Sequence, residues 1–215
     1  MTLTHFAIIA VCAYLLGSLS FAIIVSKLTL GKDIRNYGSG NSGTTNALRV
    51  MGKKAGLIVF AGDFLKTVFA CLAARIIFKG SPDTDLYVLY AGLGVVLGHN
   101  FPCYLNFKGG KGIASMAGIL VSMDWRVTLV CAALFLGAVI ITRYVSLGSI
   151  LVVISFFIQI LVYGAHGTFT VSADHLMEFY VVAFVLMAMA IWRHKTNIKR
   201  LLSGTENKLW GGKKN

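Results

Sequence analysis

Long apolar stretches alternate with short polar segments along the 215 residues of the chain. A transmembrane helix needs about 20 consecutive, mostly apolar residues, because the hydrocarbon core of a bilayer is about 30 Å thick. Five stretches reach or approach that length: His5 to Leu28, Ala55 to Phe78, Arg126 to Ile141, Ser146 to Tyr163 and Met177 to Trp192. The pattern predicts an all-α, polytopic membrane helical bundle.

Two shorter apolar runs, Leu86 to Gly98 and Ile113 to Met123, lie between the second and third of these stretches. As helices they would be about 20 and 16 Å long, which is less than the thickness of the bilayer core. If both runs cross, the bundle has about seven transmembrane helices, and if neither crosses it has about five. The chain ends lie on opposite sides in either case. We predict the seven-helix arrangement, because the polar segment between the two runs otherwise stops halfway across the membrane.

Positive charge is unevenly shared between the two sides of this bundle. Most of the 20 Lys and Arg residues lie in segments 29–54 and 99–112, in a turn at Arg143 and in the C-terminal tail. With seven helices these segments share one side, and the loops of the other side carry only Lys79 and Arg126. Short loops rich in Lys and Arg stay in the cytoplasm during insertion. We therefore predict that the N-terminus is outside and the C-terminus is cytoplasmic.

Composition excludes several other classes of protein. The chain is 57% hydrophobic and 13% charged, whereas a soluble domain averages about 25% charged residues. The net charge of +12 is divided among loops between apolar runs, so we do not expect nucleic-acid binding. The four cysteines lack the spacing of a metal site, and no repeat or linker divides the chain. Residues 1–215 are expected to form a single domain with no metal.

The first predicted cytoplasmic loop contains a glycine-rich segment, Gly38 to Asn46, followed by Arg49. The segment matches the dinucleotide fingerprint GxGxxG, but that fingerprint follows a β-strand, and here a membrane span precedes it. Glycines allow backbone N–H groups to form a concave anion site, and arginine supplies a planar fork that suits phosphate. A flexible loop is the alternative interpretation, because such loops are usually rich in Gly, Ser and Asn.

A second polar segment begins at Gly98-His99 and ends in Gly109-Gly110-Lys111-Gly112, directly before an apolar run. The free N–H groups at the start of a helix attract anions, so this end resembles a phosphate cradle. It is not a Walker motif, because Ile113 stands where Ser or Thr would hold magnesium. Nucleotide hydrolysis is therefore not expected. A positive-inside membrane anchor is the alternative, and it explains the lysine but not the glycines.

The third segment leaves the last apolar stretch at His194 and runs to Glu206. If the helix continues, His194 and Asn197 share one stripe and Arg200 lies on a neighbouring one. Taken alone, such a basic end is most often a membrane-surface anchor. Three donor-rich segments on the same predicted face nevertheless favour a site for phosphate groups.

Two ionisable residues, Asp63 and Lys66, lie one helical turn apart inside the second apolar stretch. Charged groups within a membrane are costly and normally face protein or water. An ion pair that holds helices together and a direct part in a site are equal alternatives.

These three segments resemble the motifs of the bacterial membrane acyl-phosphate:glycerol-3-phosphate acyltransferases. The matching patterns are GSGNxGxTNxxR at Gly38 to Arg49, GHxxPxxxxFxGGKG at Gly98 to Gly112, and HxxNIxRLxxGxE at His194 to Glu206. The resemblance implies transfer of a fatty acyl group from acyl phosphate to the 1-hydroxyl of glycerol 3-phosphate, which gives lysophosphatidic acid and phosphate. It implies a multi-pass protein of the bacterial cytoplasmic membrane, with a cytoplasmic active site, contact with membrane lipid and no cofactor. The upstream enzyme that forms acyl phosphate is a candidate partner.

The resemblance also implies roles for particular residues. The implied catalytic residues are Ser39, His194 and Asn197. The implied substrate-binding residues are Gly38, Gly40, Asn41, Gly43, Thr45, Asn46, Arg49, His99, Gly109, Gly110, Lys111, Gly112 and Arg200. Backbone N–H groups of the glycines are expected to contribute donors.

No Ser-His-Asp or Cys-His arrangement can be placed, so we expect direct transfer without a covalent enzyme intermediate. Either the phosphate of the substrate or His194 is expected to take the hydroxyl proton. Two other classes of protein compete with this prediction. A small transporter would use Asp63 and Lys66 as pathway residues, and a non-catalytic lipid-binding protein would form no product.

Overall fold

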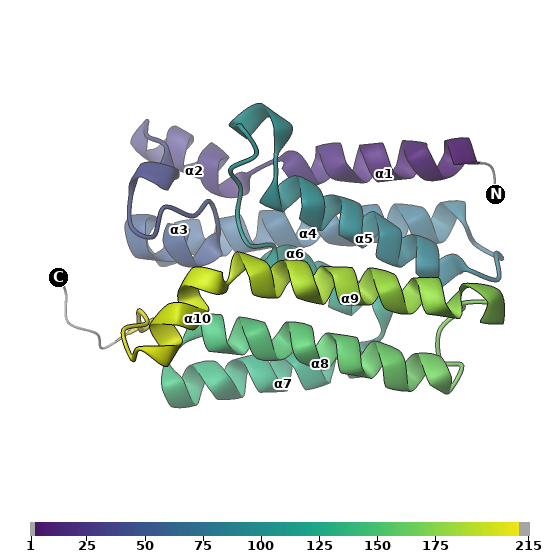
Figure 1. Ribbon diagram of the computed structural model, residues 1–215. Helices are drawn as coiled ribbons and strands as arrows, with labels where there is room; N and C mark the ends of the chain where they lie inside the picture. The colour runs from purple at the N-terminus through teal and green to yellow at the C-terminus, as the bar shows by residue number, and fades with distance from the viewer. Residues whose placement is uncertain (1–2, 211–215) are drawn as a thin grey trace.

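The computed structural model describes residues 3–210, and every regular element in that range is helical (Figure 1). The helices are α1 (Leu3–Ser18), α2 (Phe21–Leu30), α3 (Thr44–Met51), α4 (Lys53–Ile77), α5 (Thr84–Asn100), α6 (Ile113–Met123), α7 (Trp125–Thr142), α8 (Val145–Ala165), α9 (Leu176–Arg193) and α10 (Lys195–Leu202). Short 3-10 turns occur at Ile34–Asn36, Cys103–Leu105 and Ala173–His175. The prediction of an all-α membrane bundle is confirmed.

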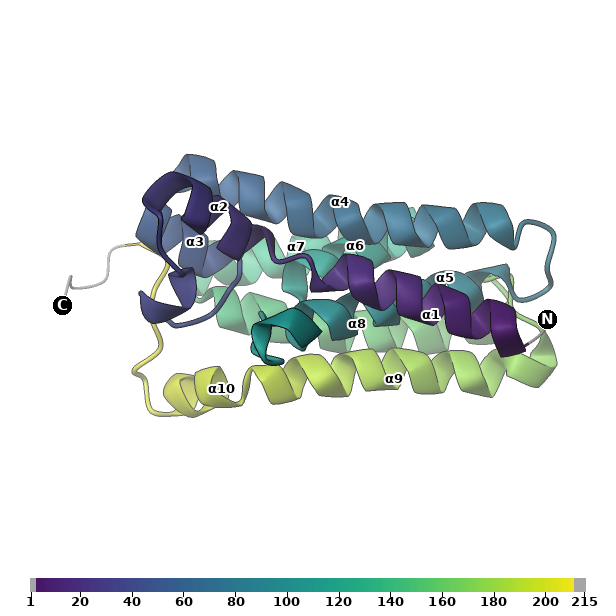
Figure 2. The ribbon, with the colours of Figure 1, turned by 90° about the horizontal axis from the view of Figure 1, so that it is seen from above.

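Among the described residues, six helical segments are long and apolar enough to cross a membrane: α1 together with α2, α4, α5, α7, α8 and α9. The predicted seventh helix, α6, has only 11 residues. It lies near the middle of the bundle in two views (Figures 1 and 2) and packs against α4, α5 and α7. Helix α1 begins at the end of the bundle opposite α10 (Figure 1).

The first predicted span is not one continuous helix. The apolar pattern predicts a helix through Leu28, but α1 ends at Ser18 and α2 begins at Phe21. A break inside a membrane frees backbone carbonyls, which need new hydrogen-bond donors. The buried Lys66 ammonium supplies them, with Nζ 2.9 Å from the carbonyl oxygen of Gly17 and 2.8 Å from that of Leu19. The expectation of an unbroken helix is therefore wrong, and a distant lysine makes the break possible.

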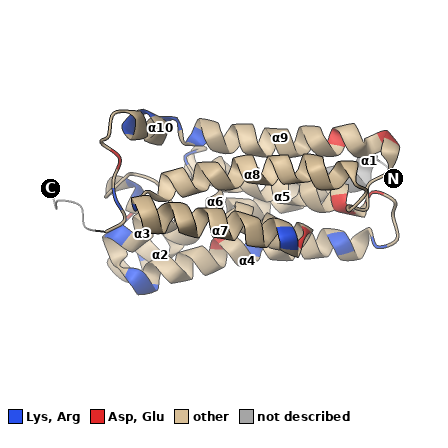
Figure 3. Ribbon diagram, turned by 90° about the horizontal axis from the view of Figure 1, so that it is seen from below, with Lys and Arg blue, Asp and Glu red and all other residues tan. Residues whose placement is uncertain are grey.

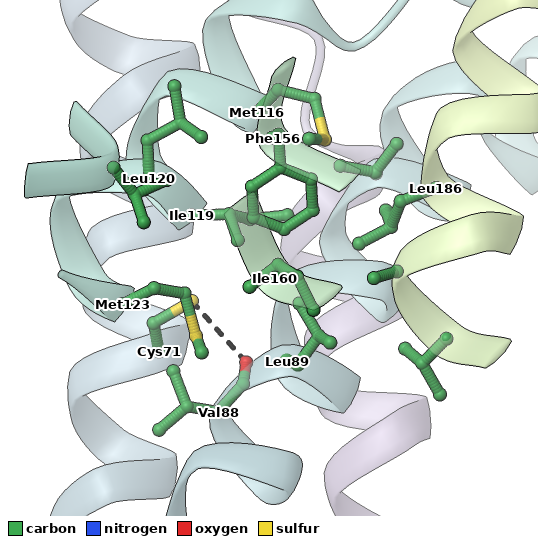
Figure 4. Close-up of a cluster of buried hydrophobic side chains, with 14 of the residues drawn as sticks. Cys71, Val88, Leu89, Met116, Ile119, Leu120, Met123, Phe156, Ile160 and Leu186 are labelled. Carbon is green, nitrogen blue, oxygen red and sulfur yellow. Dashed lines mark hydrogen bonds between the residues drawn. The ribbon is translucent and has the colours of Figure 1, made fainter. Parts of the chain in front are cut away.

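Helix α5 is the most buried of the six spans, because small residues let its neighbours approach closely. A methyl group added at Gly92 would come within 2.7 Å of Ile119 on α6, and one at Gly98 would come within 2.1 Å of the carbonyl oxygen of Tyr14 on α1. Figure 4 shows the apolar core beside this helix, where Phe156 of α8 and Leu186 of α9 belong to one buried cluster with Ile119 of the short helix α6.

The three predicted polar segments gather at one end of the bundle. In Figure 2, α2 and α3 lie beside α4 at that end, and α10 lies there at the end of α9. Most of the Lys and Arg positions lie at this end of the bundle, and most of the Asp and Glu positions lie at the other end (Figure 3). The segment between α5 and α6 belongs to the same group, because Arg193 at the end of α9 donates hydrogen bonds to the carbonyls of Gly109 and Gly110.

Candidate active site

Asn46, in the first turn of α3, holds the first glycine-rich loop in shape. Its Nδ2 donates to the carbonyls of Ile34, Tyr37 and Asn41 at 3.3, 3.0 and 3.0 Å. Its Oδ1 accepts from the N–H group of Ser39 at 2.8 Å. The side chain is buried. The amide of Asn46 is therefore committed to shaping the loop.

Two glycines of this loop have positive φ angles, +60° at Gly38 and +72° at Gly40. A methyl group at Gly38 would come within 2.2 Å of Asn46 Oδ1, so only glycine fits there. The N–H group of Gly40 donates to the carbonyl of Tyr37 at 3.1 Å, and it is not free for a phosphate. The loop instead presents Ser39, Asn41, Gly43, Thr44 and Thr45 to a pocket.

The Gly109 to Gly112 segment packs directly against the end of α5. The N–H groups of Gly109 and Gly110 donate to the carbonyls of Asn100 and His99 at 3.2 and 3.1 Å. These two N–H groups are therefore not the free phosphate donors that the sequence suggests. Gly112, with a φ of +79°, is the N-cap of α6 and lines the pocket.

Lys111 points from this segment toward α10, where Nζ donates to Asn197 Oδ1. Glu206 completes the cluster: its Oε1 accepts from Asn197 Nδ2 and its Oε2 accepts from Arg200 Nε, both at 2.9 Å. Burial lowers the pKa of Lys111 to about 8; Glu206 opposes this shift, and the guanidiniums of Arg200, Arg193 and Arg49 add to it. The Lys111 side chain is therefore mostly protonated at neutral pH, and it loses its proton and its charge at mildly alkaline pH.

His194 has a fixed tautomer at the junction of α9 and α10. Its Nδ1 lies 2.8 Å from the carbonyl oxygen of Ala190, which can only accept, so Nδ1 carries the proton and Nε2 is left as an acceptor. Burial lowers the pKa of His194 to about 4, in spite of the hydrogen bond to Ala190. The ring is neutral at physiological pH.

These groups surround one cavity with a volume of about 170 Å³. It is lined by Ser39, Asn41, Gly43, Thr45, Asn46, Arg49, His99, Lys111, Gly112, His194, Asn197 and Arg200 among the residues implied from the sequence. Gly38, Gly40, Gly109 and Gly110 do not line it, and they shape the two loops that do. All three polar segments therefore contribute to one site.

Several lining residues were missed by reasoning from the sequence. Glu206 is the last residue of the third motif, and its place in that motif was the only feature of the sequence that could have identified it as a site residue. Ser146 and Ser149 come from the start of α8, and Phe60 and Phe135 come from α4 and α7. No pattern in the sequence distinguishes these four from ordinary span residues.

The pair of charges on α4 also belongs to this region, because Asp63 lines the cavity. Lys66 Nζ lies 2.7 Å from Asp63 Oδ1 and 3.2 Å from His99 Nδ1. The pair therefore joins α4 to the break between α1 and α2, and its carboxylate borders the cavity.

The fold and the site together define a multi-pass membrane protein with a cation-rich pocket at one end of its helical bundle. The chain matches the glycerol-3-phosphate acyltransferase family over residues 7–204. It is 44% identical to a glycerol-3-phosphate acyltransferase of Clostridioides difficile (strain 630), over 97% of this chain and 98% of that one. It is 40% identical to that of Chlorobaculum tepidum, over 99% and 100%.

Two solved structures are also similar to this one, and both are of PlsY (YgiH), an integral membrane glycerol 3-phosphate acyltransferase. The glycerol 3-phosphate form has a TM-score of 0.82 and 39% identity over 96% of each chain. The lysophosphatidic acid form has a TM-score of 0.79 and 36% identity over 95% of each chain. The chain belongs to the glycerol-3-phosphate acyltransferase family, and it is an integral membrane acyltransferase.

Proposed function

We propose that this enzyme transfers a fatty acyl group from acyl phosphate to the 1-hydroxyl of glycerol 3-phosphate. The products are lysophosphatidic acid and inorganic phosphate, and the reaction is the first acylation of phospholipid synthesis. In the transfer, the hydroxyl oxygen bonds to the acyl carbon, the bond from that carbon to the phosphate oxygen breaks, and phosphate leaves with the hydroxyl proton.

The convergence of three cationic side chains on one pocket is the observation that carries this proposal. Arg49, Lys111 and Arg200 come from three different polar segments and line the same cavity. Both substrates carry a phosphate group, and a cluster of cations with several N–H donors suits two such groups. A transporter would not need all three phosphate-type segments at one end of the bundle.

Part of the cavity lining is apolar and suits the acyl chain. Phe60 of α4, Phe135 of α7 and Ile113 of α6 are among the lining residues. Helix α7 is the least buried of the six spans, so a chain that leaves the cavity along it reaches the lipid side of the bundle quickly. We propose that the donor enters with its phosphate among the cations and its tail along this wall.

The fixed tautomer of His194 suggests how the hydroxyl is held. Nε2 is an acceptor, so it orients the hydroxyl group by accepting its hydrogen bond. A group with a pKa of about 4 is a weak base, and a phosphate group has a second pKa of about 6. We therefore propose that the phosphate of the donor takes the proton. Ser39 and the Lys111–Asn197 pair then support the charge that develops on the acyl oxygen.

A phosphate-release assay on purified protein tests the proposed reaction. Acyl phosphate and glycerol 3-phosphate together are expected to give phosphate and lysophosphatidic acid in equal amounts, and acyl phosphate alone is expected to give little phosphate. Absence of product with both substrates would favour a lipid-binding protein or a transporter.

The pH dependence of kcat/KM should reveal the loss of the proton from Lys111. Its pKa of about 8 describes the free enzyme, and the profile of kcat/KM reports groups of the free enzyme. Above pH 8 the ammonium loses its proton and its attraction for phosphate. We expect kcat/KM to fall by roughly tenfold per pH unit on that side, and the fall to move to higher pH in a Lys111→Arg variant. An unchanged alkaline limb in Lys111→Arg would assign the limb to another group.

We further propose that the protein lies in the bacterial cytoplasmic membrane, with the pocket facing the cytoplasm, where the enzyme that forms acyl phosphate can reach it. The uneven distribution of Lys and Arg supports this orientation. A Lys108→Cys variant, with Cys103 replaced by serine, should react with an impermeant thiol reagent only in inverted vesicles. Labelling of intact cells would show that this loop lies outside, which is the opposite of the proposed orientation.

A further inference from the structure

Three ionisable side chains meet beneath the pocket, away from lipid. Asp63 and Lys66 belong to α4, His99 ends α5, and only 1%, 3% and 6% of their surfaces are exposed. The proposed reaction gives Asp63 and Lys66 no task. Their arrangement determines what His99 can do.

The hydrogen bonds of Lys66 are fully assigned. Its Nζ lies 2.7 Å from Asp63 Oδ1, 2.8 Å from the carbonyl oxygen of Leu19 and 2.9 Å from that of Gly17. An ammonium group has three protons and cannot accept. These three oxygens therefore use all of its donors and hold Nζ in one place.

His99 presents Nδ1 to this ammonium at 3.2 Å. A proton on Nδ1 would point at a cation, whereas a lone pair on Nδ1 is attracted to it. Asp63 Oδ1 is slightly farther from Nδ1, at 3.4 Å, and has a second lone pair that could accept a proton from it. The shorter distance to the ammonium favours an unprotonated Nδ1 with the ring proton on Nε2.

The Nε2 corner of the ring faces the segment that carries Lys111. A methyl group at Gly110 would come within 2.2 Å of Nε2 but only within 3.0 Å of Cδ2 and Cε1, so Nε2 is the nearest ring atom. His99 also lines the cavity. Nε2 thus lies against the backbone of Gly110, at the edge of the cavity that His99 and Lys111 line.

We propose that Lys66 fixes His99 as the neutral Nε2–H tautomer, and that Nε2–H donates a hydrogen bond to an anionic oxygen of the bound substrate. The identity of that oxygen rests on the proposed acyl transfer. Lys66 is a positioning residue, held by Asp63 and by the break between α1 and α2. The site then has two neutral histidines with opposite tasks: His194 accepts a hydrogen bond and His99 donates one.

The competing arrangement is an Asp63–His99 dyad, with the proton on Nδ1 and Nε2 acting as a base. Nitrogen-15 NMR of histidine-labelled protein in bilayers distinguishes the two without any turnover. The His99 signals are assigned by their loss in His99→Gln, and His166→Gln, which removes an exposed loop histidine, serves as the matched control. We expect an unprotonated Nδ1, a protonated Nε2, and a shift of the Nε2 signal when glycerol 3-phosphate is added.

A proton on Nδ1, a doubly protonated ring, or an Nε2 signal that glycerol 3-phosphate and inorganic phosphate both leave unchanged would each overturn the proposal. Because these readouts need no catalysis, they stand even if the phosphate-release assay shows a different reaction.

Activity gives a second, independent test. Glutamine at position 99 keeps an N–H donor about where Nε2 of the histidine lies, whereas leucine has no donor. We expect kcat/KM to fall about 100-fold in His99→Leu, and less than about tenfold in His99→Gln, as for loss and retention of one donor to a developing anion. His166→Gln should match the unmodified protein. Equal losses in the two His99 variants, with the fold retained, would identify a base, and full activity in His99→Leu would exclude any contact.

Discussion

Replacement of His194 by alanine is expected to lower kcat roughly 100-fold, the usual effect of losing a group that positions a reacting atom. The variant loses the Nε2 acceptor that orients the hydroxyl. The neighbouring cations stay in place, so KM for glycerol 3-phosphate should change much less than kcat. Initial rates at saturating acyl phosphate, over a range of glycerol 3-phosphate, separate the two effects.

His175→Ala is the matched control for this experiment. His175 lies at the other end of the bundle, where Nδ1 is 2.9 Å from Asp83 Oδ2, and its loss should leave kcat unchanged. If His194→Ala raised KM by the whole factor and left kcat intact, His194 would be a binding residue for the acceptor rather than an orienting one.

Replacement of Lys66 by methionine is expected to destabilise the fold by about 3–5 kcal/mol, the usual effect of breaking a buried ion pair. The change leaves the Asp63 carboxylate without its counter-ion. It also removes the donor to the carbonyls of Gly17 and Leu19 at the break in the first span. Thermal or denaturant unfolding in a fixed detergent measures the loss.

Two further variants make this result specific. Lys53→Met removes an exposed lysine at the start of α4 and should have little effect. Asp63→Asn combined with Lys66→Met leaves no uncompensated charge, so the pair should recover part of the stability lost by Lys66→Met alone. A Lys66→Met protein as stable as the unmodified one would mean that the ion pair does not support the break.

Features that depend only on residues close together along the chain were predicted well from the sequence. The apolar stretches that make up most of α4, α7, α8 and α9 can be recognised locally, because the cost of placing a residue in a bilayer depends mainly on its own type. The short length of α6 was also visible, although its place inside the bundle was not. The three motifs identified the family and most of the residues that line the cavity.

The break between α1 and α2 shows where such reasoning ends. The residues from His5 to Leu28 were predicted as one apolar span, and the Gly17-Ser18 pair within them is a common site of helix kinks but does not by itself predict a break. The donor that makes the break tolerable is Lys66, on another helix. A local pattern cannot contain a hydrogen bond that exists only after two helices pack.

By itself, then, the sequence determined the class of fold, the grouping of polar segments at one end and the kind of ligand. The tertiary structure decided the task of each polar group, because that depends on which partner the group meets. The amide of Asn46 and the N–H groups of Gly109 and Gly110 turned out to be used inside the protein. Glu206 joined the site, and the ammonium of Lys66 came to face His99, since packing sets these distances and spacing along the chain does not.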